Sequence, residues 1–531
     1  MSRFVRLGPG RRPRPTLLVL VGAFGLSLGA SAYGQSCDSL SGFGFDGHDV
    51  EIVEFRRVEA ADTPFAGSLP PHCRIDGVVD ARIGVDDVTY GIRFALALPE
   101  NWNGRFLFQG GGGLNGSVGN PVGNTAAGGT AALTRGFAVV STDTGHRGSG
   151  FDASFMADQQ AALDFFYAAN TTLTPIAKAM IEAHYGRPIA HSYFIGCSTG
   201  GREGMIMSQR NPSFFDGIVS GAPAMRTGHS NMSLAYINAA FSEFAPRDGN
   251  GSPASLFSAA DRTLIMNSML AACDANDGLA DGMIFATGAC DFDPSELACG
   301  NGNGNGNGNG NGDADACLTA NQIAGLQKAF LGPIDSEGNQ IYPPFPWDSG
   351  LNASGDGLPG ILASGGTSPV QPQRTSGDFD VDAEAHAQNS DVLGRTGDSL
   401  LPNLSTFQQR GSKILFYHGM SDPWFSGNDT RLYYQSLAGP SGGADAVRDF
   451  SRLFLVPGMG HCGGGAAALD RFDLVSAIVD WVERDVAPDR VIGTGDALPG
   501  RSRPLCGYPE YAHYAGGDPE AAESFECRLP Q

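Results

Sequence analysis

The chain has 531 residues, and 34 lysine and arginine residues against 56 aspartate and glutamate residues give a formal net charge of −22 at pH 7. A hydrophobic fraction of 41% and a charged fraction of 17% predict a large folded core and exclude a disordered acidic protein, and the 76 glycines follow no collagen-like triplet. An acidic chain without a basic patch repels phosphate backbones, so we exclude nucleic acid as a partner.

Residues 1–32 predict a secretory signal peptide. Arginines at positions 3, 6, 11, 12 and 14 precede an apolar run over 17–28, and the small residues Ala30-Ser31-Ala32 follow it. The run is interrupted by glycine and is short for a membrane span, so a membrane anchor is the weaker alternative. We therefore expect a secreted or periplasmic protein with no membrane partner.

The segment 33–225 has the pattern of a parallel α/β sheet, in which short apolar strands alternate with helices. The same pattern resumes over 401–531, so the two segments are predicted to build one catalytic domain. The predicted strands are 91–99, 105–109, 137–142, 191–196, 413–419 and 452–458, and the predicted helices are 158–185, 202–210 and 472–484.

The segment 226–400 loses this periodicity and is rich in Gly, Pro, Asn, Asp and Ser. Short helices are predicted at 260–272 and 319–330, and we interpret the whole segment as an inserted second domain. Within it, residues 301–312 are six consecutive Asn-Gly pairs. Such a tract is too polar and too flexible to pack, which predicts a disordered surface loop.

Export makes disulfide bonds the natural interpretation of the ten cysteines, which all follow the signal segment. No Cys-x-x-Cys pair occurs, which weakens zinc and redox hypotheses. Connectivity cannot be computed from sequence, but neighbours along the chain suggest four pairs and leave Cys197 and Cys462 over. The four suggested pairs are Cys37–Cys73, Cys273–Cys290, Cys299–Cys317 and Cys506–Cys527.

The sequence Gly196-Cys197-Ser198-Thr199-Gly200 is a G-x-S-x-G motif between a predicted strand and a predicted helix. This context is the one in which the motif forms a nucleophile elbow, because the glycines let the chain turn sharply and present the serine hydroxyl. Ser198 is therefore the candidate nucleophile, and a serine in an ordinary turn is the alternative.

A serine nucleophile needs a histidine base and an orienting carboxylate, which follow the serine in the order acid then histidine in α/β-hydrolases. His461 lies in a glycine-rich loop just after a strand and is the best base. Asp422, just beyond the strand before it, is the preferred acid over Asp391 and Asp398 of the irregular insertion. His418 is interpreted as a hydrogen-bonded residue at a strand end.

His146 follows Asp143 closely and imitates a catalytic pair, but both precede the serine, so we expect a structural role at a strand end. The run Gly110-Gly111-Gly112-Gly113 also follows a strand and offers unobstructed N–H groups. With the N–H of Thr199, donors from Gly112 and Gly113 are predicted to form an oxyanion hole. A phosphate-binding loop is the alternative, although no Lys-Ser/Thr pair follows.

The two remaining cysteines flank the candidate nucleophile and base, since Cys197 precedes Ser198 and Cys462 follows His461. A Cys197–Cys462 disulfide would tie the two catalytic residues together. It would also exclude Cys197 as a nucleophile, because an oxidised sulfur cannot attack.

The residues Cys197-Ser198, Asp422 and His461-Cys462 together resemble the tannase and feruloyl esterase family of secreted α/β-hydrolases, which also includes mono(hydroxyethyl) terephthalate hydrolases. The resemblance covers nearly the whole mature chain, including the Gly-rich strand end and the segments 141–146 and 503–506. It implies an α/β-hydrolase fold with a large inserted lid domain over 226–400. It also implies a secreted serine carboxylic ester hydrolase that acts on small aromatic esters of the feruloyl or galloyl type through an acyl-enzyme.

The lid carries a second match, because residues 273–283, closed by Cys290, look like the calcium loop of the family. Three carboxylates within eight residues would repel one another without a cation, and hard oxygens suit calcium. The EF-hand spacing is absent, and an acidic surface turn is the alternative. By resemblance, the ligands of a structural Ca²⁺ are the side chains of Asp274, Asp277 and Asp281 and the backbone carbonyls of Leu279 and Met283.

The resemblance says less about the substrate. The family places apolar and aromatic residues over an aromatic acyl group, and Phe425 occupies a matching wall position. Tyr342, Phe345 and Trp347 either extend this wall or form the core of the lid. Relatives that accept terephthalate hold its free carboxylate with a lid arginine, but residues 343–373 contain no Arg, Lys or His. Hydroxyaromatic esters are therefore expected to be better substrates than the terephthalate half-ester.

Two alternative functions stay open. The first is mono(hydroxyethyl) terephthalate hydrolase activity, with the missing charge supplied by Arg374 or Arg395. The second is a non-catalytic, calcium-stabilised binding protein on a hydrolase scaffold, which turnover of a p-nitrophenyl ester would distinguish from an enzyme. Neither the natural substrate nor the oligomeric state is predicted.

Overall fold

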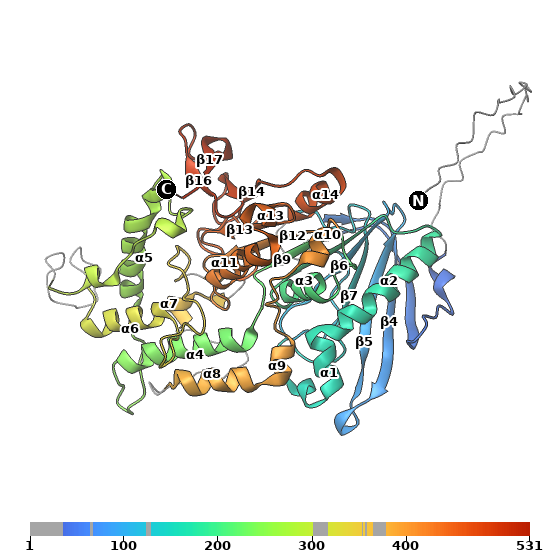
Figure 1. The fold of residues 1–531 in the computed structure, drawn as a ribbon, viewed down its shortest axis with the longest axis horizontal. Coiled ribbons are helices and arrows are strands. Elements are labelled where there is room, and N and C mark those ends of the chain that lie inside the picture. Colours follow the sequence, from blue (N-terminus) through green and yellow to red (C-terminus); the bar gives the residue numbers. More distant parts are fainter. Residues whose placement is uncertain are drawn as a thin grey trace, which may run out of the picture.

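The computed structural model describes residues 36–63, 67–123, 129–300, 317–352, 354–355, 358–364 and 379–530 (Figure 1). The predicted signal peptide, the Asn-Gly tract over 301–312 and Arg374 lie outside the described residues. Among the residues that are described, no helix is both long enough and apolar enough to cross a membrane.

A nine-stranded sheet in the order β1-β4-β5-β7-β6-β8-β9-β12-β13 forms the centre of the molecule. The first three strands pair antiparallel, β7 runs antiparallel to β5, and the strands from β7 to β13 are mutually parallel. Its strands are β1 (Val50–Val58), β4 (His72–Ile83), β5 (Thr89–Pro99), β6 (Arg105–Gln109), β7 (Ala138–Thr142), β8 (His191–Cys197), β9 (Gly217–Gly221), β12 (Lys413–Gly419) and β13 (Ser451–Val456). This mixed sheet with helices on both faces confirms the predicted α/β class.

Alternate side chains of the parallel strands enter two separate hydrophobic cores, one on each face of the sheet. Phe106 and Phe108 of β6 belong to one core and Leu107 to the other. On β8, Phe194 joins the first core and Tyr193 the second. The apolar runs seen in the sequence are therefore strands buried on both sides, which explains why these strands could be predicted.

Helices cover both faces of the sheet. One face packs against α2 and α3, and the other against α14. A single π-helical turn, Asp164–Ala168, joins α1 to α2 within the predicted helix 158–185. The helices outside the 226–400 segment are α1 (Gln159–Leu163), α2 (Ala169–Tyr185), α3 (Thr199–Arg210), α10 (Ser405–Gln409), α11 (Gly427–Ser436), α12 (Ala438–Ser441), α13 (Ala444–Arg448) and α14 (Leu474–Arg484).

The segment predicted as an insertion leaves the sheet after β9 and returns to it at β12, and its helices gather to one side of the sheet (Figure 1). Residues 234–362 contribute a third hydrophobic core that is separate from the two sheet cores. Capping boxes at Ser258 and Thr319 begin two of its helices. The elements here are α4 (Thr227–Phe244), α5 (Ala259–Cys273), α6 (Ala320–Leu331), α7 (Ile361–Ser364), α8 (Val381–Ser390), α9 (Val392–Thr396), β10 (Ser354–Gly355) and β11 (Leu358–Pro359).

The amino-terminal strands β1 and β4 were not predicted. They form an antiparallel pair at the edge of the sheet, and the long β1 strand has many exposed side chains, so it lacks the continuous apolar run of the inner strands. Smaller two-stranded sheets complete the fold: β2 (Ala61–Thr63) with β3 (Gly67–Leu69), β14 (Arg490–Thr494) with β15 (Ser502–Cys506), and β16 (Tyr511–Tyr514) with β17 (Phe525–Arg528).

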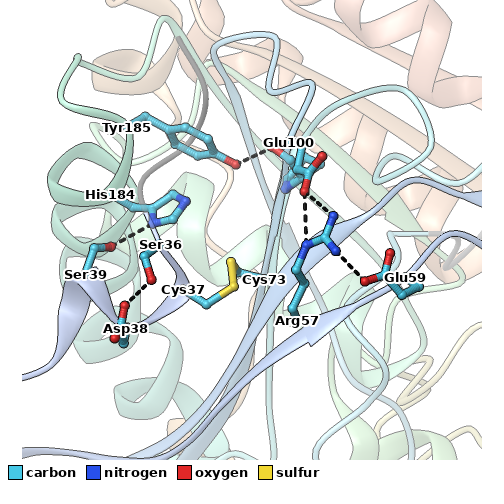
Figure 2. Close-up of a disulfide and its surroundings, with 11 residues drawn as sticks. Ser36, Cys37, Asp38, Ser39, Arg57, Glu59, Cys73, Glu100, His184 and Tyr185 are labelled. Atoms are coloured by element: carbon cyan, nitrogen blue, oxygen red, sulfur yellow. Dashed lines mark hydrogen bonds and ion pairs between the residues drawn. A yellow bond between two sulfur atoms is a disulfide. The ribbon is translucent and has the colours of Figure 1, made fainter.

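All ten cysteines are paired, and the five disulfides are the pairs that the sequence suggested. Figure 2 shows Cys37–Cys73, which ties the segment before β1 to the start of β4. Beside it, the Ser39 hydroxyl is hydrogen-bonded to His184 Nδ1 at 3.0 Å. Tyr185 donates its hydroxyl hydrogen to the Pro99 carbonyl at 2.7 Å, so the end of α2 anchors this edge of the sheet.

Candidate active site

Ser198 occupies a sharp turn between β8, which ends at Cys197, and α3, which begins at Thr199. Its φ of 63° and ψ of −123° lie outside the regions that side-chain-bearing residues normally occupy, as in a nucleophile elbow. A Cβ atom added at Gly200 would come within 2.7 Å of the Gly111 carbonyl oxygen, so this position needs a glycine. The helix starts earlier than predicted because Ser198 itself takes the cap position.

Asp422 and His461 form a buried hydrogen-bonded pair at the carboxyl ends of β12 and β13. His461 Nδ1 donates to Asp422 Oδ2 at 2.7 Å. The other carboxylate oxygen, Oδ1, accepts from the backbone N–H groups of Trp424 at 2.8 Å and Phe425 at 3.1 Å. The carboxylate is thereby held in one orientation, which also fixes the orientation of the imidazole.

The pKa of Asp422 reflects a competition between burial and its partners. Burial alone would raise this pKa, but the charge interaction with His461 and hydrogen bonds from His418 and His461 leave it well below its ordinary value. Asp422 is therefore ionised throughout the neutral range, and it can stabilise a protonated imidazole during a reaction.

His418 is also buried beside Asp422, with its Nε2 at 3.3 Å from Asp422 Oδ2. The same nitrogen donates to the Phe425 carbonyl at 3.0 Å, and Nδ1 accepts from the Thr430 hydroxyl at 2.8 Å. Both ring nitrogens are therefore engaged in internal contacts, which fits a structural residue at the strand end.

The second ring nitrogen of His461 is the atom available for proton transfer. His461 Nε2 is buried and has no hydrogen-bond partner among the residues that the structure describes. The Cys197–Cys462 disulfide, with a Cα–Cα distance of 5.9 Å, joins the residue before Ser198 to the residue after His461. The loop that carries His461 is thereby tied to the turn at Ser198.

The glycine run after β6 docks onto the start of α3. The Gly110 N–H donates to the Ile195 carbonyl at 2.8 Å and the Gly111 N–H to Glu203 Oε2 at 3.0 Å. By contrast, within the described part of the chain, the N–H groups of Gly112, Gly113 and Thr199 have no acceptor. These three unpaired donors are the ones predicted for the oxyanion hole.

Glu203 was missed by the sequence analysis. It is 2% exposed, and burial raises its pKa while the hydrogen bond from Gly111 opposes the rise. Its Oε1 also accepts from the Asn115 side chain at 3.4 Å. Only the folded contact between α3 and the glycine run reveals this anchor, because an acidic residue in a helix carries no distinguishing sequence signal.

Aromatic side chains flank His461 on the side of the acid loop. The ring centroids of Phe425 and Trp424 lie 5.3 and 4.9 Å from that of His461. Phe151, which is 46% exposed, meets Trp424 edge to face at 5.8 Å. Phe425 was predicted as a wall residue, whereas Trp424 and Phe151 were missed.

The lid aromatics for which two roles were left open lie in the lid core. Trp347 stacks on Phe330 at 3.8 Å, and Tyr342 and Phe345 are almost completely buried in the same cluster. Tyr342 contributes its hydroxyl oxygen as an acceptor for the Ser426 N–H at 3.1 Å.

The remaining sequence candidates have internal partners. His146 Nε2 donates to the Leu114 carbonyl at 2.9 Å, while Asp143 pairs with Arg93. Asp391 caps α9 by accepting from the Gly394 N–H. Arg395 is exposed and donates to the Asn389 carbonyl at 3.1 Å.

The segment resembling a calcium loop is a compact turn after α5. Asp274 Oδ2 accepts from the Gly282 N–H, and Asp277 from the Leu279 and Phe285 N–H groups. Asp274 Oδ1 is buried without a partner in the described residues, and burial raises the pKa of Asp277 to about 7. Buried carboxylate oxygen that lacks a donor fits a cation.

The charge of the third carboxylate in this turn is balanced differently. Asp281 forms ion pairs with Arg501 and with the fully buried Arg503. Across the described part of the chain, no three His, Cys, Asp or Glu side chains are grouped so as to hold a metal. A calcium hypothesis therefore depends on Asp274, Asp277 and backbone carbonyls more than on a preassembled carboxylate cluster.

The chain is similar in sequence to one protein family over most of its length. The sequence profile described as "Tannase and feruloyl esterase" matches residues 73–367 and 373–528. The chain is 37% identical over 549 residues to the mono(2-hydroxyethyl) terephthalate hydrolase of Piscinibacter sakaiensis, covering 91% of this chain and 88% of that protein. It is 32% identical over 447 residues to a probable feruloyl esterase B-1 of Aspergillus fumigatus, covering 79% of each chain.

A solved structure is similar over almost the same extent. The crystal structure of feruloyl esterase B from Aspergillus oryzae superposes with a TM-score of 0.74 at 26% identity, covering 93% of this chain and 99% of that chain.

Proposed function

The chain belongs to the tannase and feruloyl esterase family of carboxylic ester hydrolases, and from this premise we propose that it hydrolyses esters of aromatic acids through an acyl-enzyme on Ser198. One observation carries the mechanism. His461 donates from Nδ1 to the ionised Asp422, which leaves its buried Nε2 unpaired as a proton acceptor, and the Cys197–Cys462 disulfide ties the loop of His461 to the turn at Ser198.

In the first half-reaction, Ser198 Oγ attacks the ester carbonyl carbon while His461 Nε2 takes the hydroxyl proton. The carbonyl oxygen becomes an oxyanion that accepts hydrogen bonds from Thr199 and from Gly112 or Gly113. The intermediate then expels the alcohol, which receives the proton from His461. Ser198 is left acylated.

In the second half-reaction, water attacks the acyl-enzyme and gives one proton to His461 Nε2. The second tetrahedral intermediate collapses, the carboxylic acid leaves, and the proton returns to Ser198 Oγ. Asp422 stays ionised throughout, because its role is to orient the imidazole and to stabilise its charged form.

The direct test is Ser198→Ala on a p-nitrophenyl ester. Esterase activity should fall below about a thousandth of the wild-type value, because the covalent route is lost while folding is unaffected. An unchanged melting temperature in the variant shows that the loss is chemical. Retention of substantial activity would contradict the assignment, and absence of turnover in the wild type would favour the binding-protein alternative.

The preferred substrates are hydroxyaromatic esters of the feruloyl or galloyl type. Trp424 and Phe425 place aromatic faces beside the imidazole, where a planar acyl group can stack. Phenolic hydroxyls need only hydrogen-bond partners, whereas a buried substrate carboxylate needs a cation. Residues 343–373 supply no Arg, Lys or His, and Arg395 is exposed on α9.

A second candidate is hydrolysis of the mono(2-hydroxyethyl) ester of terephthalate, which the 37% identity to such a hydrolase favours. The two candidates are separated by kcat/KM on methyl ferulate, methyl gallate and the terephthalate half-ester under one set of conditions. A higher value for the half-ester would overturn the preference for hydroxyaromatic esters and would direct attention to Arg374 or Arg395 as the missing cation.

Export and calcium complete the proposal. Disulfides form and persist in oxidising compartments, so the five disulfides of this chain support a secreted or periplasmic location. The turn over 274–283 would hold Ca²⁺ through the Asp274, Asp277 and Asp281 carboxylates and the Leu279 and Met283 carbonyls. A bound cation would neutralise the buried carboxylates and so stabilise the lid; it would have no part in the ester chemistry.

A further inference from the structure

Asp348 is a fully buried carboxylate of the lid that lies far from the nucleophile in sequence and outside any helix or strand. A single oxygen of this side chain, Oδ2, accepts two hydrogen bonds. One comes from the Ser421 hydroxyl at 2.5 Å and the other from the Gly458 N–H at 2.7 Å. These two donors belong to different loops, one after β12 and one after β13.

Each of these loops carries one member of the acid–base pair. Ser421 immediately precedes Asp422, and Gly458 is three residues before His461. Asp348 therefore bridges the loop of the acid to the loop of the base at a point outside the Asp422–His461 hydrogen bond.

The contact region is tightly packed and has little freedom to shift. The Gly350 N–H donates to the Ser421 hydroxyl oxygen at 2.8 Å, and the Ser421 N–H donates to the Met459 carbonyl at 2.9 Å. A Cβ atom added at Gly350 would approach Ser421 Oγ to 2.5 Å and the Gly458 carbonyl oxygen to 2.8 Å. A lost bond here cannot readily be replaced by a side chain moving into the space.

The lid also touches the catalytic domain in a second, independent way. Arg226, next to the start of α4, forms an ion pair with the buried Asp429 of α11 at 2.5 Å. That contact anchors the lid but joins neither catalytic loop to the other. Asp429 therefore serves as the control for Asp348, because it is a buried carboxylate that only anchors the lid.

We propose that Asp348 is a positioning residue through which the lid sets the spacing between the acid loop and the base loop, so that docking of the lid and assembly of the acid–base pair are a single event. The inference rests on the proposed roles of Asp422 and His461. Burial raises the pKa of the Asp348 carboxyl to about 6, and the hydrogen bonds that the carboxylate accepts, with those from Ser421 and Gly458 the largest, oppose this rise.

The experiment compares Asp348→Ala, Asp348→Asn and Asp429→Asn on a p-nitrophenyl ester, with kcat, KM and melting temperature measured for each. Asp348→Ala should lower kcat by at least about 30-fold with less than about a threefold change in KM, since misplacement of catalytic groups affects the rate more than binding. Asp348→Asn keeps an acceptor oxygen and should return to within about threefold of the wild-type kcat. Asp429→Asn should lower the melting temperature and leave kcat within about twofold.

A purely structural anchor would give a different pattern. If Asp348→Ala lowered the melting temperature but kept the wild-type kcat, or if Asp429→Asn lowered kcat as much as Asp348→Ala, the positioning role would be overturned. Failure of Asp348→Asn to rescue kcat would also overturn it, because the proposal depends on the acceptor atom and not on the charge.

Ser421→Ala provides an independent test if Asp348→Ala does not fold. It removes one of the two bonds and leaves the carboxylate in place, so kcat should fall by about fivefold; an unchanged kcat would overturn the proposal. In a folded double variant, loss of Asp348 and Ser421 together should be no worse than loss of Asp348 alone. If Ser198→Ala proved fully active, the proposed mechanism would fail, whereas an inactive Ser198→Ala with a fully active Asp348→Ala would refute only the role of Asp348.

Discussion

Removal of the Cys197–Cys462 disulfide should separate its contribution to stability from its contribution to catalysis. The perturbation is the double substitution Cys197→Ala and Cys462→Ala, which keeps each Cβ atom and removes only the sulfur bridge. The bridge closes a sequence separation of 265 residues, for which the loop-entropy relation gives about 5.6 kcal/mol of stabilisation. The Cys273–Cys290 and Cys299–Cys317 bridges shorten the effective loop, but the logarithmic dependence makes this correction small.

The Cys37–Cys73 bridge serves as the matched control. It closes a separation of 36 residues, for which the same relation gives about 4 kcal/mol, and it lies at the β1–β4 edge of the sheet. Its removal should therefore lower the free energy of unfolding by about 2 kcal/mol less than removal of Cys197–Cys462. It should not change kcat at a temperature where both variants are folded.

Removal of Cys197–Cys462 should in addition lower kcat by about 10- to 100-fold, because Ser198 and His461 lose the covalent link between their neighbours. The assay is steady-state hydrolysis of a p-nitrophenyl ester, with urea unfolding followed by circular dichroism. Equal kcat values in the two double variants would refute the reasoning, since the disulfide would then stabilise the fold without holding the catalytic residues. Free thiols at both positions in the exported wild-type protein would refute it as well.

Four further predictions follow from individual contacts. Glu203→Ala should lower kcat by about 10- to 100-fold, because it releases the Gly111 N–H and with it the glycine run after β6. Glu203→Gln keeps an acceptor oxygen and should therefore retain most of the wild-type kcat. Chelation of calcium should lower the melting temperature of the wild type by several degrees and leave Asp274→Asn unchanged; an equal effect on both would favour an acidic turn without a cation. Trp424→Leu should raise the KM for methyl ferulate, and this increase should be about 10 times as large, as a ratio to wild type, as the increase in the KM for p-nitrophenyl acetate measured side by side. Equal increases for the two substrates would exclude stacking of the ferulate ring on Trp424. The folded-state pKa of Asp348, about 6, exceeds its unfolded value, so the stability that this group contributes is present at low pH and is lost as the pH rises from about 4 to 6. Over that range the free energy of unfolding of Asp348→Asn, measured in urea, should rise by about 2 kcal/mol relative to that of the wild type. A difference that does not depend on pH would contradict the raised pKa.

The parts of the fold that could be predicted are those whose signals are local. Strands such as β6 and β12 are buried on both faces and read as apolar runs, and the strand–turn–helix context of Ser198 is written in consecutive residues. The acid-then-histidine order that follows the nucleophile in α/β-hydrolases then predicts Asp422 and His461 as the acid and the base. The structure brings these two side chains into direct contact.

The parts that could not be predicted depend on contacts between distant segments. Glu203 is one of many acidic residues until the glycine run docks on it, and Asp348 stands in an irregular stretch whose partners are in two other loops. Trp424 follows the acid so closely that sequence alone does not say which of Trp424 and Phe425 faces the imidazole; in the structure both do. The β1–β4 pair was missed because an edge strand with one exposed face lacks an apolar run.

The position of the lid in the chain has a consequence for biosynthesis. Strand β9, Gly217–Gly221, pairs with β12, Lys413–Gly419, and the whole lid is synthesised between them. During vectorial folding, β9 is an uncovered edge strand with apolar side chains until β12 arrives, and such edges promote aggregation. Closure of the sheet is therefore a late, long-range event, and Cys462, the partner of Cys197, is synthesised only after β12. Chains in which β12 has not yet paired expose β9 to one another, so slow closure of the second half of the sheet should lower the yield of native protein.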